Sequence, residues 1–145
     1  MHRNSVSIIE GSVQSTNVWL KEIAEEIGED DRADAYRVLR GVLHTLRDRL
    51  TVDEAAQFAA QLPELIRGIF YDGWNPSATP QHYASGAEFL RRVARAARLH
   101  GPTEASVCVE ATMCVIRRHV SDGEMEDVMA VLPRGIRELL APVRS

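Results

Sequence analysis

Few residues of this 145-residue chain have the types and spacing that catalysis or metal binding requires. His44 and Asp48 lie four positions apart, which would place both on one helix face and let them share a metal ion. No second histidine or cysteine pair accompanies them, so we interpret them as part of an exposed polar helix face. We predict no metal and no cofactor.

The two cysteines, Cys108 and Cys114, lie six positions apart in a predicted helix. That spacing puts them on different faces and about 9 Å apart along the axis, so they cannot form a disulfide with each other. We expect both to be buried thiols, as in a reducing cytoplasm. No signal peptide is visible over residues 1–15, and no run approaches the ~20 apolar residues of a membrane span. These observations favour a cytoplasmic protein without a membrane segment.

The motifs of common enzymes are missing from the sequence. It has no glycine-rich phosphate loop, no paired-histidine zinc motif and no serine elbow. No two carboxylates are predicted to meet on an apolar face, where burial would raise a pKa. We therefore expect a non-enzymatic protein. An enzyme would need residues that only the fold brings together, such as Arg67, Arg137, Asp72 and His82.

Aromatic residues concentrate in one connecting segment, residues 71–84 and the position before it. Phe70, Tyr71, Trp74 and Tyr83 are half of the chain's eight aromatic residues. The dipeptides Asp72-Gly73 and Asn75-Pro76 predict turns within the segment. Either Trp74 fills the seam between two halves of the protein, or the segment displays an aromatic contact surface. The candidate binding residues here are Tyr71, Asp72, Trp74, Asn75 and Tyr83.

A second candidate surface is a basic helix face that carries Arg91, Arg92, Arg95 and Arg98. Seventy residues earlier the corresponding face is acidic, with Glu22, Glu25, Glu26 and Glu29. Three interpretations are open. Both faces are ordinary solvated surfaces, or the two faces attract each other within or between chains, or the arginine face binds phosphates. The net charge of −4 argues against a nucleic-acid partner. The candidate binding residues on this face are Arg91, Arg92 and Arg95.

The elements that position these residues come from an internal repeat with an offset of 70 residues and no gap. Leu20, Ala24, Ala35, Arg47, Glu54, Ala60, Leu62, Pro63 and Arg67 recur as Leu90, Ala94, Ala105, Arg117, Glu124, Ala130, Leu132, Pro133 and Arg137. Apolar residues recur at helical spacing, and no segment alternates like a strand. The sequence predicts an all-α, internally duplicated bundle of eight helices. Two four-helix halves would pack with pseudo-twofold symmetry.

Capping boxes predict where several helices begin: Thr51 to Glu54, Ser85 to Glu88 and Ser121 to Glu124. We expect residues 1–15 to be a flexible arm and the first helix to begin near Thr16. Residues 16–145 would form one compact domain. Its repeat halves, 16–73 and 85–142, are joined by the aromatic linker 71–84. Two separate beads on a linker are the alternative.

The stretch from Thr51 to Pro63, followed by residues 66–76 with the run Tyr-Asp-Gly-Trp-Asn-Pro, resembles a bacterial family catalogued as domain of unknown function 2267. The resemblance extends over roughly residues 17–140 and is looser in the second half. It implies a compact, all-helical prokaryotic protein. It also makes the Gly-Trp-Asn-Pro segment, residues 73–76, look like a family signature, which draws attention to Tyr71 to Asn75. The family has no established activity, so the resemblance assigns no catalytic residue.

The sequence thus favours a small cytoplasmic helical module that acts through protein–protein contacts, with another protein or with itself as a homodimer. The alternative is a small-molecule binder with a pocket at the seam between the halves, lined by Trp74, Tyr71 and the apolar helix stripes. An uncharacterised enzyme is the third reading.

Overall fold

The computed structural model describes residues 2–28 and 31–143, with side chains from residue 6 onward. Within these ranges the chain forms eight α-helices, one 3₁₀ turn and no strand. The helices are α1 (His2–Ile27), α2 (Arg32–Arg49), α3 (Val52–Ala59), α4 (Glu64–Tyr71), α5 (Gly86–Ala97), α6 (Pro102–His119), α7 (Asp122–Ala130) and α8 (Arg134–Leu140), and the turn η1 spans Pro76–Ala78. The all-α prediction is confirmed.

Three helices begin at the predicted capping boxes. The hydroxyls of Thr51, Ser85 and Ser121 accept hydrogen bonds from the backbone amides three residues later, at 3.2, 3.0 and 3.2 Å. Each bond satisfies one of the amides that a helix start leaves without an intrahelical acceptor. Asp31 caps α2 in a similar way by accepting from the Ala33 amide at 2.8 Å.

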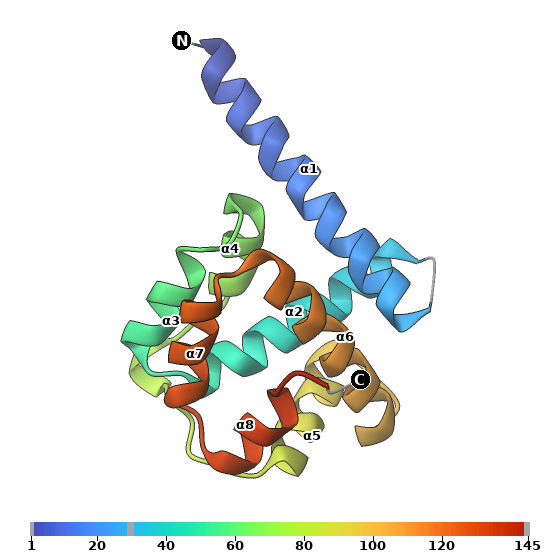
Figure 1. Ribbon diagram of the computed structural model, residues 1–145, viewed down its shortest axis with the longest axis vertical. Helices are drawn as coiled ribbons and strands as arrows, with labels where there is room; N and C mark the ends of the chain where they lie inside the picture. The colour runs from blue at the N-terminus through green and yellow to red at the C-terminus, as the bar shows by residue number, and fades with distance from the viewer. Residues whose placement is uncertain (1, 29–30, 144–145) are drawn as a thin grey trace.

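The first helix is longer than the sequence predicted. It begins at His2 rather than near Thr16, so residues 2–15 continue the same helix (Figure 1). The prediction was wrong because this segment has no capping box to mark a helix start and contains β-branched residues of lower helix propensity. Two contacts support the extension. Thr16 Oγ1 donates to the Ser12 carbonyl at 2.7 Å, and Ser12 Oγ accepts from the Leu65 amide at 2.9 Å.

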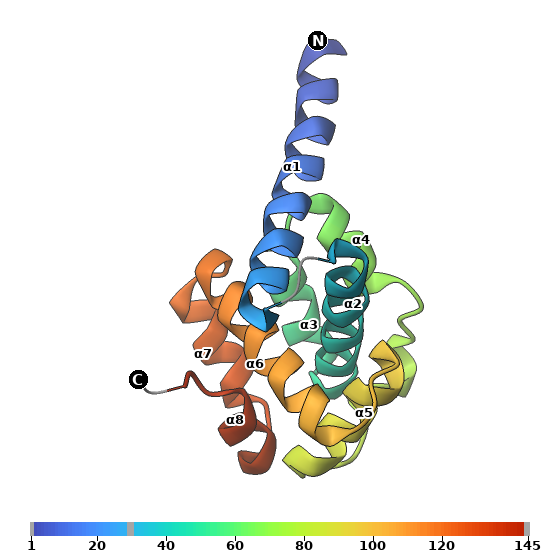
Figure 2. The same cartoon turned by 90° about the vertical axis from the view of Figure 1, so that its right-hand side faces the viewer.

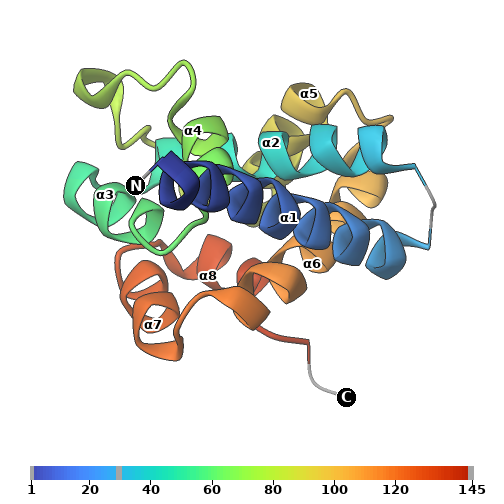
Figure 3. The same cartoon turned by 90° about the horizontal axis from the view of Figure 1, so that it is seen from above.

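The two long helices α2 and α6 contact each other and form the centre of the fold. Helix α5 packs on α2 and α6, and the second half of α1 packs on the same two helices. The short helices α3 and α7 lie side by side at one end (Figures 1 and 3). One continuous apolar core contains buried residues from α1 to α8. The N-terminal half of α1 projects from this body (Figure 2), and Ser12 is the point where this half bonds α4.

Helix positions in the second half follow those in the first. Adding 70 to the bounds of α2, Arg32–Arg49, gives those of α6, Pro102–His119, and α3 and α7 start 70 residues apart. Contacts match in the same way: α1 packs on α6 as α5 packs on α2, and α1 contacts α4 as α5 contacts α8.

Candidate functional site

A buried arginine holds the start of the connecting segment. Arg47 is 4% exposed, and its Nη1 donates to the Phe70 and Asp72 carbonyls, both at 2.8 Å. Its Nε bonds Asp48 Oδ1 at 2.8 Å, which balances the buried charge. The Asp72 side chain is exposed and pairs with Arg40 at 2.8 Å. The end of α4 is therefore fastened to α2 by charge-assisted bonds.

The aromatic side chains at this end pack inward in a chain of ring contacts. Ring centroids lie 5.5 Å apart for Phe58 and Phe70, 5.5 Å for Phe70 and Tyr71, and 5.3 Å for Tyr71 and Trp74. Tyr71 and Trp74 are half-buried against the apolar core, and Trp74 Nε1 is buried without a hydrogen-bond partner. Most of this aromatic surface therefore packs against other residues of the chain.

Tyr83, at the far end of the connector, contacts two arginines through its ring. Its ring centroid is 4.2 Å from the guanidinium carbon of Arg92 and 5.7 Å from that of Arg49. Arg49 Nε also donates to the Tyr83 carbonyl at 2.7 Å, and Arg92 donates to the side chain of Gln81. Burial raises the pKa of the Tyr83 hydroxyl to about 12, although both arginines oppose the shift. The hydroxyl thus stays protonated, and the ring serves as a cation–π platform.

The other predicted binding residues stay nearer the surface. Asn75 is exposed, and its Oδ1 caps η1 by accepting from the Ser77 amide and hydroxyl at 3.2 and 2.7 Å. Glu88 binds Arg91 at 2.7 Å and Arg92 at 2.9 Å, and these bonds hold the pKa of Glu88 below its usual value. Arg95 is exposed on α5. The fold joins Arg92 to Tyr83 and leaves Arg91 and Arg95 on the open face.

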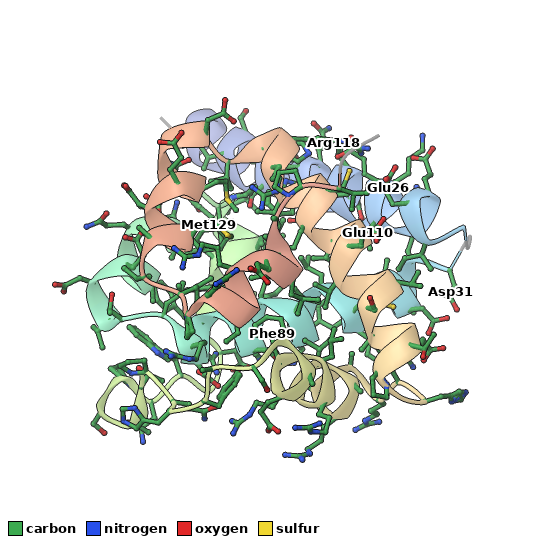
Figure 4. All side chains as sticks on the ribbon, turned by 60° about the horizontal axis from the view of Figure 1, so that its bottom comes forward. Glu26, Asp31, Phe89, Glu110, Arg118 and Met129 are labelled. Carbon is green, nitrogen blue, oxygen red and sulfur yellow. The ribbon has the colours of Figure 1, made fainter. Side chains whose placement is uncertain are left out.

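The acidic helix α1 is paired with α6. Glu22 Oε1 lies 2.7 Å from His119 Nε2, and Glu26 Oε2 lies 3.1 Å from Arg118 Nη2 (Figure 4 labels Glu26 and Arg118). His119 also stacks on Trp19, with ring centroids 4.9 Å apart. Glu29 lies outside the described residues. Among the described ion pairs none joins α1 to α5, so the alternative in which these two helices attract each other within the chain gains no support.

His44 and the cysteines differ from two expectations. His44 is half-buried rather than on an exposed polar face, and its Nε2 lies 2.6 Å from the Ile69 carbonyl. Burial is the main cause that lowers its pKa, so the ring is neutral at pH 7 and donates this bond. Cys108 is buried as predicted, whereas Cys114 is exposed. Within the described part of the chain, no three potential ligands cluster as a metal site.

The four residues suggested for an enzyme have no shared site among the described residues. Arg67 donates to the carbonyls of Ala59, Ala60 and Leu62, at 2.9, 3.3 and 2.9 Å, and thereby closes the end of α3. Asp72 is bound to Arg40. No hydrogen bond or ion pair of the described chain links either residue to Arg137 or His82.

Sequence reasoning missed one buried pair of acids. Glu54 on α3 and Glu124 on α7 are 8% and 7% exposed, and Oε2 of each is buried without a partner. Burial is the main cause that raises the pKa of Glu124 to about 8, and the neighbouring acids Glu54 and Asp127 add to the shift. The prediction that no carboxylates meet in a buried place was therefore wrong. Their recurrence at an offset of 70 was the available signal, because it pairs positions that a twofold arrangement could bring together.

The projecting half of α1 was not among the candidate surfaces predicted from the sequence. It exposes Val6, Ile8, Ile9 and Val13, with exposed fractions of 52%, 57%, 61% and 43%. A hollow of about 470 Å³ lies beside it. The hollow is lined by Ile8, Gly11, Ser12, Ser15, Val18 and Trp19 of α1, by residues 61–64 and by His119. Exposed apolar side chains gathered along one helix are a common mark of an interaction surface.

These features describe a small all-helical protein with a structural connector, a buried acid pair and an apolar projecting helix. No described helix combines the length and apolar character of a membrane span. Residues 16–139 match the family described as "Uncharacterized conserved protein (DUF2267)", and the chain belongs to this family. No curated protein matches the chain.

Proposed function

We propose that this protein is a non-enzymatic helical module that acts through protein–protein contact, and that its contact surface is the projecting half of α1. The exposed fractions of Val6, Ile8, Ile9 and Val13 are the observation that carries the proposal. Apolar surface costs about 25 cal/mol for each Å² left in water. A helix that extends such residues beyond its own domain is stabilised when a partner covers them.

The spacing of the apolar residues on α1 suits a helical partner. Val6, Ile9 and Val13 alternate steps of three and four residues, and Thr16, Leu20, Ile23 and Ile27 continue the same series. This spacing is typical of a helix that packs lengthwise against another. The one polar member, Thr16, donates its hydroxyl hydrogen to the Ser12 carbonyl, so this hydroxyl does not need a hydrogen-bond acceptor from a partner. From Leu20 onward the chain's own helices cover the series, and before Thr16 it is open (Figure 2).

We infer that the partner is a second copy of this chain. Between residues 6 and 18 the only charged residue is Glu10, so the surface does not select a strongly charged partner. A twofold pair brings the same stripe from each copy together and covers apolar residues with apolar residues. The groove beside the stripe contains Gly11, Ser12 and Ser15, whose small side chains permit a close approach of the second copy.

Sedimentation equilibrium over a range of concentrations tests this proposal. We expect the wild-type chain to dimerise and the double variant Ile9→Glu, Val13→Glu to remain monomeric with an unchanged far-UV circular dichroism spectrum. Val107→Glu is the matched control, because Val107 is 49% exposed on α6, away from the projecting segment. A wild-type chain that remains monomeric at every concentration contradicts the proposal.

The connector is the competing contact surface, and one more variant separates the two. Trp74→Ala removes half-buried packing, so we expect lower stability and unchanged dimerisation. Loss of the dimer in Trp74→Ala together with its survival in the α1 double variant would move the contact to the connector.

We also propose that the two halves are copies of one unit related by a pseudo-twofold axis. The shared 70-residue offset of helix bounds and the matched helix contacts support this arrangement. The axis would pass between α2 and α6 and between α3 and α7, the two pairs in which each helix contacts its own counterpart.

A further inference from the structure

We propose that Glu54 and Glu124 form a proton-sharing carboxyl pair that closes the seam between α3 and α7, and that loss of the shared proton loosens this seam. The inference does not depend on how α1 associates. It concerns a pair of groups that neither the connector nor the projecting helix uses.

Because of where the two acids lie, their carboxyl groups must share one proton. Helices α3 and α7 pack against each other, and both side chains are more than nine-tenths buried. Two ionised carboxylates in such a place would repel each other without water to screen them. A protonated carboxyl can instead donate a hydrogen bond to its ionised neighbour, as in other carboxyl pairs.

The local hydrogen bonds explain why Glu124 turns into the seam. In a full capping box its carboxylate would accept from the amide of Ser121. That amide donates instead to Gln61 Oε1 at 2.8 Å, and Gln61 Nε2 donates to Ser121 Oγ at 3.1 Å. Gln61 lies just after α3, so the same two bonds tie the end of α3 to the start of α7. They leave the Glu124 carboxyl free to meet Glu54.

The charges around Glu124 all favour its protonated form. Glu54 faces it across the seam and Asp127 lies on its own helix, and both are acidic. Burial, the largest cause, and these two acids raise the pKa of Glu124 to about 8 in the folded chain, against 4.5 for an ordinary glutamate. Between these values the closed seam holds a proton that a solvated seam releases to water. The closed form is fully stabilised below pH 4.5, loses stability as the pH rises and has lost this contribution above pH 8.

Carboxyl ¹³C NMR tests the shared proton directly. We expect one glutamate signal of the wild-type chain to titrate near pH 8 and to disappear in Glu124→Gln. In Glu54→Gln the remaining Glu124 signal should titrate about one pH unit lower or more, because the neighbouring charge is gone. Wild-type glutamate signals that all titrate below pH 6 would overturn the proposal.

Hydrogen exchange of the α3 and α7 amides tests the loosening. After division by the intrinsic exchange rate, opening in the wild-type chain should increase up to about tenfold per pH unit towards pH 8 and level off above it. Glu124→Gln should remove this pH dependence. The control Glu126→Gln, an exposed residue of α7, should keep it. The same pH dependence in Glu124→Gln would show that another group controls opening and would overturn the proposal.

Discussion

Arg47 and Arg117, which lie 70 residues apart in the sequence, have the same role in the structure. Each reaches from a central helix to a carbonyl at the end of the last helix of its half, Phe70 for Arg47 and Leu140 for Arg117. The carbonyls at a helix end have no intrahelical donor, and a guanidinium supplies several donors in a fixed fork. The repetition of both arginines in the sequence therefore reflects structure.

Replacing Arg47 should be costly. Arg47→Met leaves the Phe70 and Asp72 carbonyls without their donor, and we expect a loss of about 2–3 kcal/mol in the free energy of unfolding. Urea denaturation measures the loss. Arg95→Met, on the exposed face of α5, should stay within about 0.5 kcal/mol of wild type. Equal small effects in both variants would contradict a structural role for Arg47.

Tyr83 shows a residue role that spacing could not reveal. The repeat places Arg92 opposite Glu22 and Arg49 opposite His119. Where α1 packs on α6, Glu22 meets His119, whereas the corresponding arginines, where α5 packs on α2, would repel each other. The ring of Tyr83 lies over both guanidinium groups. Tyr83 belongs to the connector, which has no counterpart in the repeat. Its ring thus compensates for the replacement of an acid–histidine pair by two arginines.

At the scale of elements, the crossing of α2 and α5 depends on one glycine. A Cβ built on Gly41 would lie 2.8 Å from Ala97 Cβ and 3.0 Å from Ala97 N, closer than real side chains come. The helices approach here because neither residue carries a larger side chain. The repeat has Ala111 at the corresponding place on α6, so the close approach belongs to the α2–α5 crossing.

A pair of glycine variants tests this crossing. Gly41→Ala should lower stability by about 1–3 kcal/mol, because the steric clash exceeds the gain in helix propensity. Gly68→Ala, inside α4 with no atom within 4 Å of the new Cβ, should raise stability by about 0.5–1 kcal/mol. Thermal and urea unfolding of the two variants measure both signs. A stabilising Gly41→Ala would show that the helices separate without cost.

Helix α1 was predictable only in its second half. Its apolar series is regular from Val6 onward, but the sequence gives no partner that would make residues 2–15 helical. An isolated short helix is marginal in water, so the local pattern alone predicts an arm. The extension is stable in the structure because it continues a helix already fixed by Trp19 and Ile23, both fully buried.

At the scale of the whole molecule, both halves contribute to one apolar core. Phe58 of the first half and Phe89 of the second are both fully buried in it, and α5 packs on α2 as well as on α6. Neither half keeps its buried surface if the other leaves. We therefore expect one cooperative unfolding unit, as predicted for residues 16–145.

A core substitution in the second half tests this unity. Val93→Ala removes buried methyl groups from α5 and should destabilise the protein by about 2 kcal/mol. The tryptophan fluorescence of Trp19 and Trp74, both outside α5, should shift to the same lower midpoint as the circular dichroism signal. Two separate transitions, with only one of them shifted, would support independent beads.

The sequence by itself determined the helical class, the caps at Thr51, Ser85 and Ser121, and the 70-residue offset that the helix bounds follow. These features come from interactions within a few residues along the chain, which a single sequence displays. Only the tertiary structure decided that Glu54 meets Glu124, that Arg49 and Arg92 share Tyr83, and that α1 extends beyond the core. Those contacts join residues far apart in sequence, and their energies depend on burial that exists only after the helices have packed.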